Sequence, residues 1–312
     1  MVMKTTNGFS VEKKSLNESI SEIKNLRTSN AAKMKMLIDL GLMKGECAEI
    51  LRLASAEARA NRVVTPRFKF FFGVEIECVM NRYNFETIAR RESLPYNYER
   101  YNHIDNREYF KFTTDSSIQR NPGDNVNDPI ECVSPILEGE KKGFGKLEKC
   151  CKSLNEAGAY VNRSTGLHVH ISTPNMTDEQ YVNVFKNYKM LEGVIDTFMA
   201  RSRRENNAHY ARSLGNYNLD GCTRISDVAR AIPTRYCKVN PHSYASHKTI
   251  EFRQHLGSTN FTKIKNWVNF CAKLVKYSKD NLLTGNVNSI DEIPFLSNEE
   301  KAYFNRRAQE LA

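Results

Sequence analysis

The stretch Phe72-Gly-Val-Glu-Ile-Glu-Cys78 alternates apolar and acidic side chains, and this alternation decides the fold class that the sequence predicts. In an extended strand, residues two positions apart point to the same face of the sheet. Glu75 and Glu77 therefore share one face, while the apolar residues between them point to the other. Such a strand is typical of an antiparallel sheet that is covered on one side only.

Two later stretches repeat the alternation: Gly166-Leu-His-Val-His-Ile-Ser172 and Thr249-Ile-Glu-Phe-Arg-Gln-His255. Their polar faces carry His168 and His170 in the first stretch and Glu251, Arg253 and His255 in the second. One strand of this kind is commonly a solvated face, but solvated strands usually also contain Thr, Ser and Lys. If all three strands lie in one sheet, their polar faces converge into a single functional site.

The residue types on these faces indicate phosphoryl-transfer chemistry. Carboxylates with one or two imidazoles suit Mg²⁺ or Mn²⁺, and a guanidinium suits phosphate oxygens. The chain lacks the glycine-rich Walker sequence, so a nucleotide would be held through metal ions on the sheet. Glu131 begins a further strand, and Asp115 lies at a turn, where an aspartate is more often a turn residue than a catalytic one.

The remaining pattern alternates short strands with helices. Further strands are predicted at residues 109–114, 130–134 and 236–240, and helices near 144–154, 178–198 and 264–275. A capping box, Ser297-x-x-Glu300, predicts one more helix near the C-terminus. Residues 82–108 and 201–229 are polar and weakly patterned, which predicts loops or lids.

Residues 1–65 are predicted to form a separate helical region that ends near Pro66. Helices are expected at 17–27, 31–42 and 46–60, and residues 29–51 resemble a helix-turn-helix, with a plain helical hairpin as the alternative. The net charge of +10 favours an acidic partner, so nucleic acid is a candidate partner of residues 1–65. An ordinary basic surface is the other interpretation.

The composition is that of a globular protein, with 40% hydrophobic and 26% charged residues among 312. No apolar stretch is long enough for a membrane span, and the N-terminus lacks an apolar signal core, so a cytoplasmic protein is expected. The eight cysteines form no C-x-x-C pair and lie among apolar residues. They are predicted to be buried thiols, neither a zinc knuckle nor a disulfide framework.

Taken in order, six motifs resemble the amidoligase family, which is related to glutamine synthetase and the glutamate–cysteine ligases. They are Gly73-Val-Glu-Ile-Glu77, Asp115-Ser-Ser, Glu131-Cys-Val-Ser-Pro135, Gly166-Leu-His-Val-His170, Arg235-Tyr-x-x-Val-Asn240 and Thr249-Ile-Glu-Phe-Arg253. The resemblance covers about residues 68–280. No single motif is specific, but their order along the chain is.

The resemblance implies an α+β fold with a curved, mainly antiparallel, glutamine-synthetase-like sheet and helices packed on one face. The catalytic domain would span residues 66–285, with a helical tail at 286–312. The open face would hold Mg²⁺, or Mn²⁺, together with ATP. ATP would phosphorylate a carboxylate-bearing substrate, and an amine donor would attack the acyl phosphate to form an amide.

The resemblance also implies a role for each residue of the motifs. The expected metal ligands are Glu75, Glu77, Glu131, His168 and Glu251. The expected nucleotide or substrate contacts are His170, Arg235, Asn240 and Arg253, of which Arg253 would act on the transferring phosphoryl group. Asp115 would orient or deprotonate the amine, although Ser116 replaces the glycine that follows the acid in the family pattern.

Two other functions are compatible with parts of the sequence. A metal-dependent hydrolase could use the same carboxylates and histidines with a metal-bound water and no nucleotide. A nucleic-acid-binding or structural protein could use the basic helical N-terminus. The loops carry no pattern that identifies the carboxylate or the amine.

Overall fold

The computed structural model describes residues 15–26, 28–60, 68–100, 102, 104 and 106–312. The chain divides into two compact units, Met1–Asn61 and Arg62–Ala312. In the first unit, three helices surround a small apolar cluster of Leu37, Cys47 and Leu51. These helices are α1 (Leu16–Asn25), α2 (Asn30–Asp39) and α3 (Lys44–Ala60). The turn between α2 and α3 contains Gly41 at φ +92°, a conformation that glycine adopts readily.

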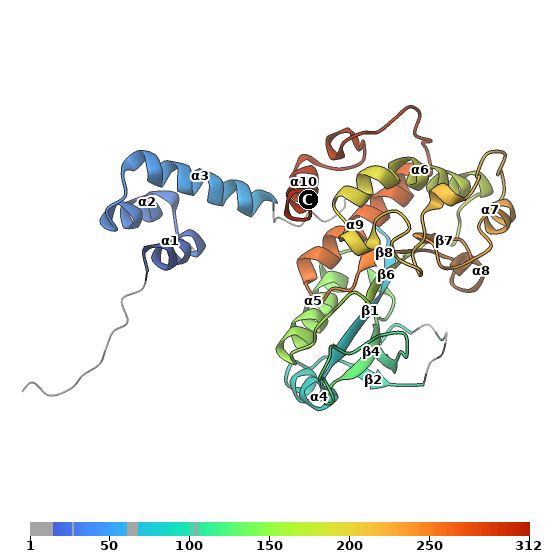
Figure 1. Ribbon diagram of the computed structural model, residues 1–312, viewed down its shortest axis with the longest axis horizontal. Coiled ribbons are helices and arrows are strands. Elements are labelled where there is room, and N and C mark those ends of the chain that lie inside the picture. The colour runs from blue at the N-terminus through green and yellow to red at the C-terminus, as the bar shows by residue number, and fades with distance from the viewer. Residues whose placement is uncertain (1–14, 27, 61–67, 101, 103, 105) are drawn as a thin grey trace, which may run out of the picture. The chain divides into compact units, whose positions relative to one another are not determined.

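The second unit is built on one open sheet, which confirms the predicted α+β class with a mainly antiparallel sheet (Figure 1). Its strand order is β2-β3-β4-β1-β6-β8-β7, with β5 also paired to β1. Among these pairs, only β2 and β3 run parallel. The strands are β1 (Phe71–Met80), β2 (Tyr96–Tyr98), β3 (Phe110–Thr114), β4 (Asp128–Val133), β5 (Leu137–Glu138), β6 (Gly166–Ser172), β7 (Val239–Asn240) and β8 (Thr249–Leu256).

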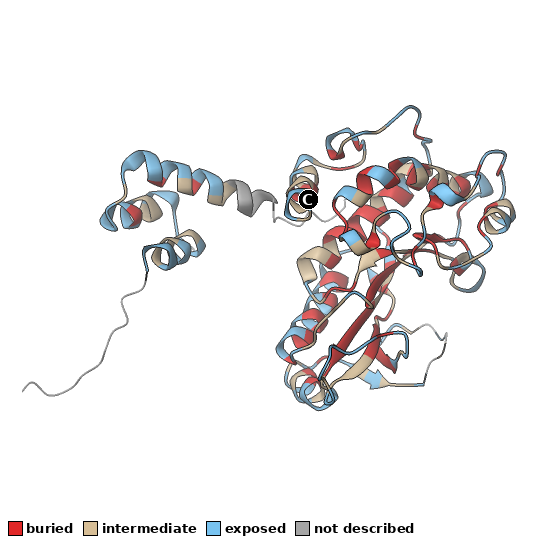
Figure 2. Ribbon diagram, in the orientation of Figure 1, coloured by how far each residue is buried: buried red, intermediate tan, exposed pale blue. Residues whose placement is uncertain are grey.

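Helices cover the apolar face of this sheet. Phe72 of β1 stacks on Phe144 of α5 (Lys141–Glu156) at 5.0 Å between ring centroids. The ring of Phe252 of β8 lies 6.5 Å from that of Trp267 of α9 (Phe261–Ser278). Figure 2 shows buried residues running along the sheet and along the helices beside it. The helices of this unit are α4 (Arg82–Arg91), α5 (Lys141–Glu156), α6 (Asp178–Thr197), α7 (Ile225–Ala231), α8 (Ser243–His247), α9 (Phe261–Ser278) and α10 (Asn298–Glu310).

The predicted loop at residues 82–108 is wrong in its first half, because α4 and β2 lie there. The side chain of Asn81 caps α4 by accepting a hydrogen bond from the Asn84 N–H at 3.0 Å. Phe85 and Ala89, four positions apart, are fully buried. Two buried apolar positions among arginines, asparagines and a glutamate make too faint a period to detect in the sequence. Residues 201–229 likewise contain two short 3₁₀ helices and the start of α7.

His255 does not share the polar face of β8, contrary to the alternation in the sequence. Opposite β6, Val169 pairs with Phe252 but Leu167 pairs with His255, so β8 contains one extra residue, a β-bulge. The bulge turns His255 toward the helices, where its ring lies 5.9 Å from that of Trp267. Burial there lowers the pKa of His255 to about 4.

The C-terminal helix α10 begins at the predicted capping box of Ser297 and Glu300. Its Tyr303 and Phe304 are buried in the same core as the sheet. All eight cysteines are buried free thiols, as the sequence predicts. None of the helices in the described part of the chain combines the length and apolar character that crossing a bilayer requires.

A buried ion-pair network joins the sheet to α6 and provides a test of the fold. The Lys238 side chain is fully buried, and its Nζ lies 2.7 Å from Glu192 Oε1 and 2.7 Å from Asp196 Oδ1. Lys238→Met leaves these carboxylates without their cation. We expect the free energy of unfolding to fall by about 3–5 kcal/mol, measured by urea denaturation. Lys142→Met, on the exposed side of α5, is the control, and equal midpoints for the two variants would contradict the prediction.

Candidate active site

The polar face of the sheet is organised in three rows of side chains that run across the strands. The first row, across β3, β4 and β1, is Thr113, Glu131 and Glu77. The second, which continues to β6, is Lys111, Val133, Glu75 and His168. The third, across β1, β6, β8 and β7, is Gly73, His170, Glu251 and Asn240. Residues directly opposite each other lie roughly 5 Å apart, so the rows form one continuous polar floor.

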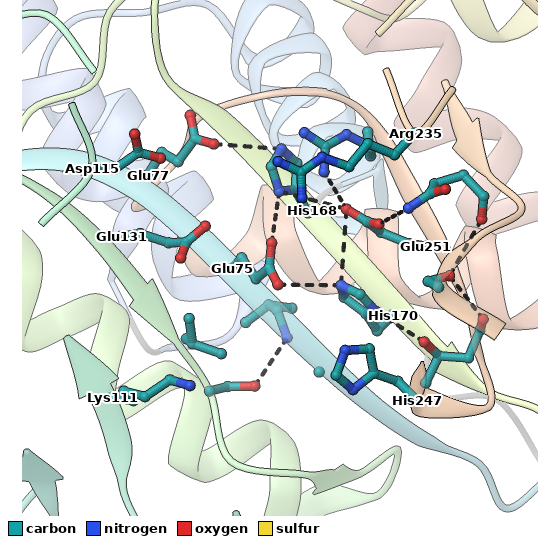
Figure 3. Close-up of a pocket in the computed structure, with 18 of the residues that line it drawn as sticks. Glu75, Glu77, Lys111, Asp115, Glu131, His168, His170, Arg235, His247 and Glu251 are labelled. Carbon is teal, nitrogen blue, oxygen red and sulfur yellow. Dashed lines mark hydrogen bonds and ion pairs between the residues drawn. The ribbon is translucent and has the colours of Figure 1, made fainter. Parts of the chain in front are cut away.

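This floor lies in a cavity of about 840 Å³, a size suited to an organic ligand such as a nucleotide. All the site residues predicted from the sequence line it, and Figure 3 shows most of them. Those on the strands are Glu75, Glu77, Glu131, His168, His170, Asn240, Glu251 and Arg253, and those from loops are Asp115 and Arg235. The sheet thus brings together residues from positions 75 to 253 of the chain.

Glu75 lies between the two histidines at the centre of the floor (Figure 3). Its Oε2 is 2.8 Å from His168 Nδ1, and its Oε1 is 3.3 Å from His170 Nε2. Burial opposes ionisation of this carboxyl, but the two imidazoles outweigh it and hold the pKa of Glu75 well below its usual range. His168 Nε2 also lies 3.5 Å from Glu77 Oε1.

Glu251 joins the imidazoles to the guanidinium of Arg253. Arg253 Nη1 donates a hydrogen bond to Glu251 Oε1 at 2.5 Å, and Asn240 Nδ2 donates to Oε2 at 2.6 Å. His168 Nδ1 is 3.8 Å from the same Oε1. Burial opposes the charge of Glu251, but Arg253 together with the imidazoles of His170 and His168 outweighs it, so the pKa of this carboxyl is lowered. Glu251 is therefore an anion with its oxygens oriented by neighbours.

Glu131 has the opposite electrostatic environment. Burial, together with the neighbouring carboxylates of Glu75, Glu77 and Asp115, raises the pKa of Glu131 to about 9. A carboxyl in this position binds a proton at neutral pH unless another cation replaces it. The crowding of acids around Glu131 is thus a physical reason for a cation to bind here.

The donor atoms of this floor fit divalent cations. Within the described residues, three overlapping groups place donor atoms within 4.8 Å of one another: Glu75, His170 and Glu251; Glu75, Glu131 and His168; and Glu77, Asp115 and Glu131. The buried His170 Nε2 has no hydrogen-bond partner in that part of the chain, although Glu75 is near. The first two groups combine carboxylate oxygens with one imidazole nitrogen, and the third contains carboxylates only; both kinds of donor set suit Mg²⁺ or Mn²⁺.

Asp115 lies in the turn after β3, where its Oδ1 accepts a hydrogen bond from the Ser117 N–H at 2.7 Å. Ser116, which replaces the family's glycine, is not among the described non-glycine residues with positive φ. The turn therefore does not need a glycine at this position, and the substitution leaves Asp115 in the cavity.

Two cationic residues of the cavity were not predicted from the sequence. Arg203 is 6% exposed, its Nη2 donates to the Thr165 carbonyl at 2.5 Å, and its Nε has no partner among the described residues. Arg203 lies in the polar region at 201–229, where the sequence shows neither helical nor strand periodicity that would distinguish it. Lys111 alternates with the buried Phe110 and Phe112 on β3, and this alternation was the available signal.

Gly166 provides a test of the proposed metal ligands next to it. Its N–H donates to Glu77 Oε2 at 2.5 Å, and an added Cβ would lie 2.9 Å from His168 Nε2. Since His168 is held by Glu75, we expect Gly166→Ala to displace these groups and weaken Mn²⁺ binding by at least about tenfold, measured by calorimetry. Gly145→Ala on α5, where a Cβ meets nothing within 4 Å, is the control. Wild-type affinity in Gly166→Ala would show that these groups do not hold the metal.

The fold and the site together define a class of protein: an α+β protein with a cavity of carboxylates, imidazoles and guanidiniums on the open face of an antiparallel sheet. The chain belongs to the amidoligase family. The family described as "putative amidoligase enzyme" matches residues 69–275, which confirms the resemblance seen in the motifs and indicates a ligase. No curated protein gave a match to the chain.

Proposed function

We propose that the protein is an ATP- and Mg²⁺-dependent ligase that joins a carboxylate to an amine through an acyl phosphate. The observation that carries the proposal is the set of three overlapping metal-donor groups beside the buried guanidinium of Arg203 and the half-buried guanidinium of Arg253. A floor of anions beside guanidiniums accommodates both the metal ions and the phosphates of a nucleotide. The order of the motifs supports a relationship between this sheet and that of glutamine synthetase.

The chain's own residues would divide the work between metal and nucleotide. Glu75, Glu77, Glu131, His168 and Glu251 would hold the cations, which neutralise phosphate charge when bound. Arg253, oriented by Glu251, would contact the transferring phosphoryl group as negative charge develops on it. The expected nucleotide contacts are His170, Arg235 and Asn240.

The reaction would proceed in two substitutions. An oxygen of the substrate carboxylate attacks the γ-phosphorus of ATP, and the bond from that phosphorus to the β–γ bridging oxygen breaks, which releases ADP. The amine nitrogen then attacks the acyl carbon, and the carbon–oxygen bond to phosphate breaks. Asp115, at the edge of the donor group with Glu77 and Glu131, would accept the proton that the amine loses.

A hydrolase is a weaker explanation of this cavity. It would use the same donor groups to activate water, but it gives no role to the two guanidiniums beside the acids, those of the buried Arg203 and the half-buried Arg253. Membership of the amidoligase family does not favour a nucleic-acid-binding function.

Calorimetric titration of ATP into the full-length protein tests the proposal directly. We expect ATP to bind in the presence of Mg²⁺ and to lose at least about tenfold in affinity when EDTA replaces the metal, because the phosphates meet a floor of carboxylates without it. Binding of equal strength in both conditions would contradict a metal-mediated site. The same titration with ADP shows whether the γ-phosphate contributes.

A further inference from the structure

Lys111 is a buried cation that the proposed chemistry of metal and nucleotide does not use. Lys111 is 4% exposed, and it lies on β3, where it lines the cavity. Its Nζ donates to the backbone carbonyl of Asn102 at 2.9 Å and to Asn102 Oδ1 at 3.0 Å. Both partners are neutral oxygens, and within the described residues no carboxylate forms an ion pair with Lys111. The Glu99 carboxylate, which accepts a hydrogen bond from Asn102 Nδ2 at 2.8 Å, interacts with Lys111 electrostatically without forming an ion pair with it. A buried ammonium without an ion-paired anion is costly unless a ligand supplies one.

The register places Lys111 at a defined distance from the metal-donor groups. Val133 of β4 pairs with Lys111 of β3 on one side and with Glu75 of β1 on the other. Two strand spacings, or roughly 10 Å, therefore separate the Cα atoms of Lys111 and Glu75. In Figure 3, Lys111 lies beyond Glu75 and Glu131, at the end of the view away from Arg235. The cavity therefore has one end with guanidiniums, a centre with acids, and a second end with a single ammonium.

Val133 lies between Lys111 and Glu75, and the floor is open beside Glu75, at Gly73 on the same strand. Gly73 carries no side chain, and the nearest atoms to a Cβ built there are His170 Cβ and Ser134 Oγ, both at 3.9 Å. Neutral side chains that line the cavity together with Lys111 include Asn102, which accepts from its ammonium, and Asn106 and Ile136. A neutral lining with one ammonium favours a small anion, whereas the acidic centre repels one unless metal is bound.

We propose that this end of the cavity binds a second carboxylate of the acyl substrate, so that the substrate is a dicarboxylic acid. This inference rests on the proposed function: one carboxyl group lies at the metal-donor groups near Glu75 and is activated, while the other forms an ion pair with Lys111. A compact ammonium suits a single carboxylate, whereas the planar guanidiniums at the other end suit phosphate. The open floor at Gly73 leaves room for the chain that joins the two carboxyl groups.

The test measures binding of simple acids to the full-length protein in the presence of Mg²⁺ and ADP. The probes are linear dicarboxylates from succinate to suberate and the monocarboxylates of equal chain length. Titration calorimetry is expected to show that at least one dicarboxylate binds about tenfold to a hundredfold more tightly than its monocarboxylate, as a hydrogen-bonded charge pair implies. No preference for any dicarboxylate in the wild type would overturn the proposal.

Two variants assign the preference to Lys111 by different means. Lys111→Met removes the charge and keeps the length of the side chain. Asn102→Asp keeps Lys111 but places a carboxylate 3.0 Å from its Nζ, so the ammonium is neutralised internally. Both variants should lose the preference for dicarboxylates, while Lys142→Met on the exposed side of α5 keeps it. Circular dichroism checks that each variant is folded.

The outcomes separate this inference from the proposed function. A dicarboxylate preference that survives in Lys111→Met and Asn102→Asp overturns the inference, even if ATP binds with Mg²⁺. A preference that depends on Lys111 in a wild-type protein that does not bind ATP supports the subsite and overturns the ligase proposal.

Discussion

Glu251→Gln is expected to abolish Mg²⁺-dependent ATP binding and amide formation, with a loss of at least about a hundredfold in affinity or turnover. Glu251 belongs to a donor group with Glu75 and His170, and it also orients Arg253 through a 2.5 Å hydrogen bond. The substitution keeps the shape of the side chain and removes its charge. The metal then loses an anionic ligand, and the phosphate contact of Arg253 loses its orientation.

The measurement is the ATP titration described above, repeated on the variant with and without Mg²⁺, together with ADP release once a substrate is known. Glu138→Gln is the matched control, because Glu138 lies on β5 of the same sheet and is exposed. Glu251→Ala complements the Glu251→Gln variant by removing the whole carboxyl group. The buried Asn240 side chain then loses its hydrogen-bond acceptor, so folding of Glu251→Ala must be checked by urea denaturation. Unchanged Mg²⁺-dependent binding in Glu251→Gln, with the control also unchanged, would remove Glu251 from the proposed metal site.

Glu131→Gln is expected to make the protein more stable in EDTA and less able to bind Mg²⁺. Without a cation, neighbouring acids and burial raise the pKa of Glu131 to about 9, whereas an unfolded glutamate has a pKa of about 4.3. Between these values the folded state binds one more proton than the unfolded state, so stability falls as pH rises. A glutamine has no proton to lose, so the free energy of unfolding of Glu131→Gln near pH 7 should exceed that of the wild type by on the order of 1–3 kcal/mol.

Mg²⁺ should reverse this order of stabilities, because the metal replaces the proton on Glu131. The affinity of Mg²⁺ for the wild type should rise with pH up to about 9, because the metal displaces the proton bound to Glu131. Glu131→Gln should lose this pH dependence. Urea midpoints in EDTA and in Mg²⁺, taken from about pH 6 to about pH 9, measure both effects. Parallel pH profiles for wild type and Glu131→Gln in EDTA would mean that Glu131 is an ordinary carboxylate. Glu138→Gln is again the control.

The candidate site was predicted from the sequence because its residues occupy alternate positions on strands with apolar partners. The pairs Glu75 and Glu77, and His168 and His170, share a face for local reasons: the strand repeats every two residues. Asp115 and Arg235 lack this signal, and only the order of the family motifs marked them. All of these residues line the cavity, whereas their chemical roles stay predictions until metal and nucleotide binding are measured.

Arg203 and Lys111 show why part of the cavity was missed. Arg203 reaches the site from a short 3₁₀ helix in a polar region, where neither alternation nor helical spacing distinguishes one arginine from its neighbours. Lys111 does alternate with Phe110 and Phe112, but a lysine in a strand is the usual mark of a solvated face. Lys111 is buried because Asn102, which lies in a loop, covers its ammonium and because β4, which follows later in the chain, pairs with β3. Neither contact leaves a mark in the sequence around Lys111.

The sequence by itself determined which residues share a face of β1 and of β6, which segments form the main helices, and to which family the chain belongs. These properties depend on neighbours within a few positions or on the order of short motifs. Only the tertiary structure decided that Lys111, Val133, Glu75 and His168 form one row, and that a bulge in β8 turns His255 away from it. Strand order and register result from the packing of the whole apolar face against the helices, so no local pattern encodes them.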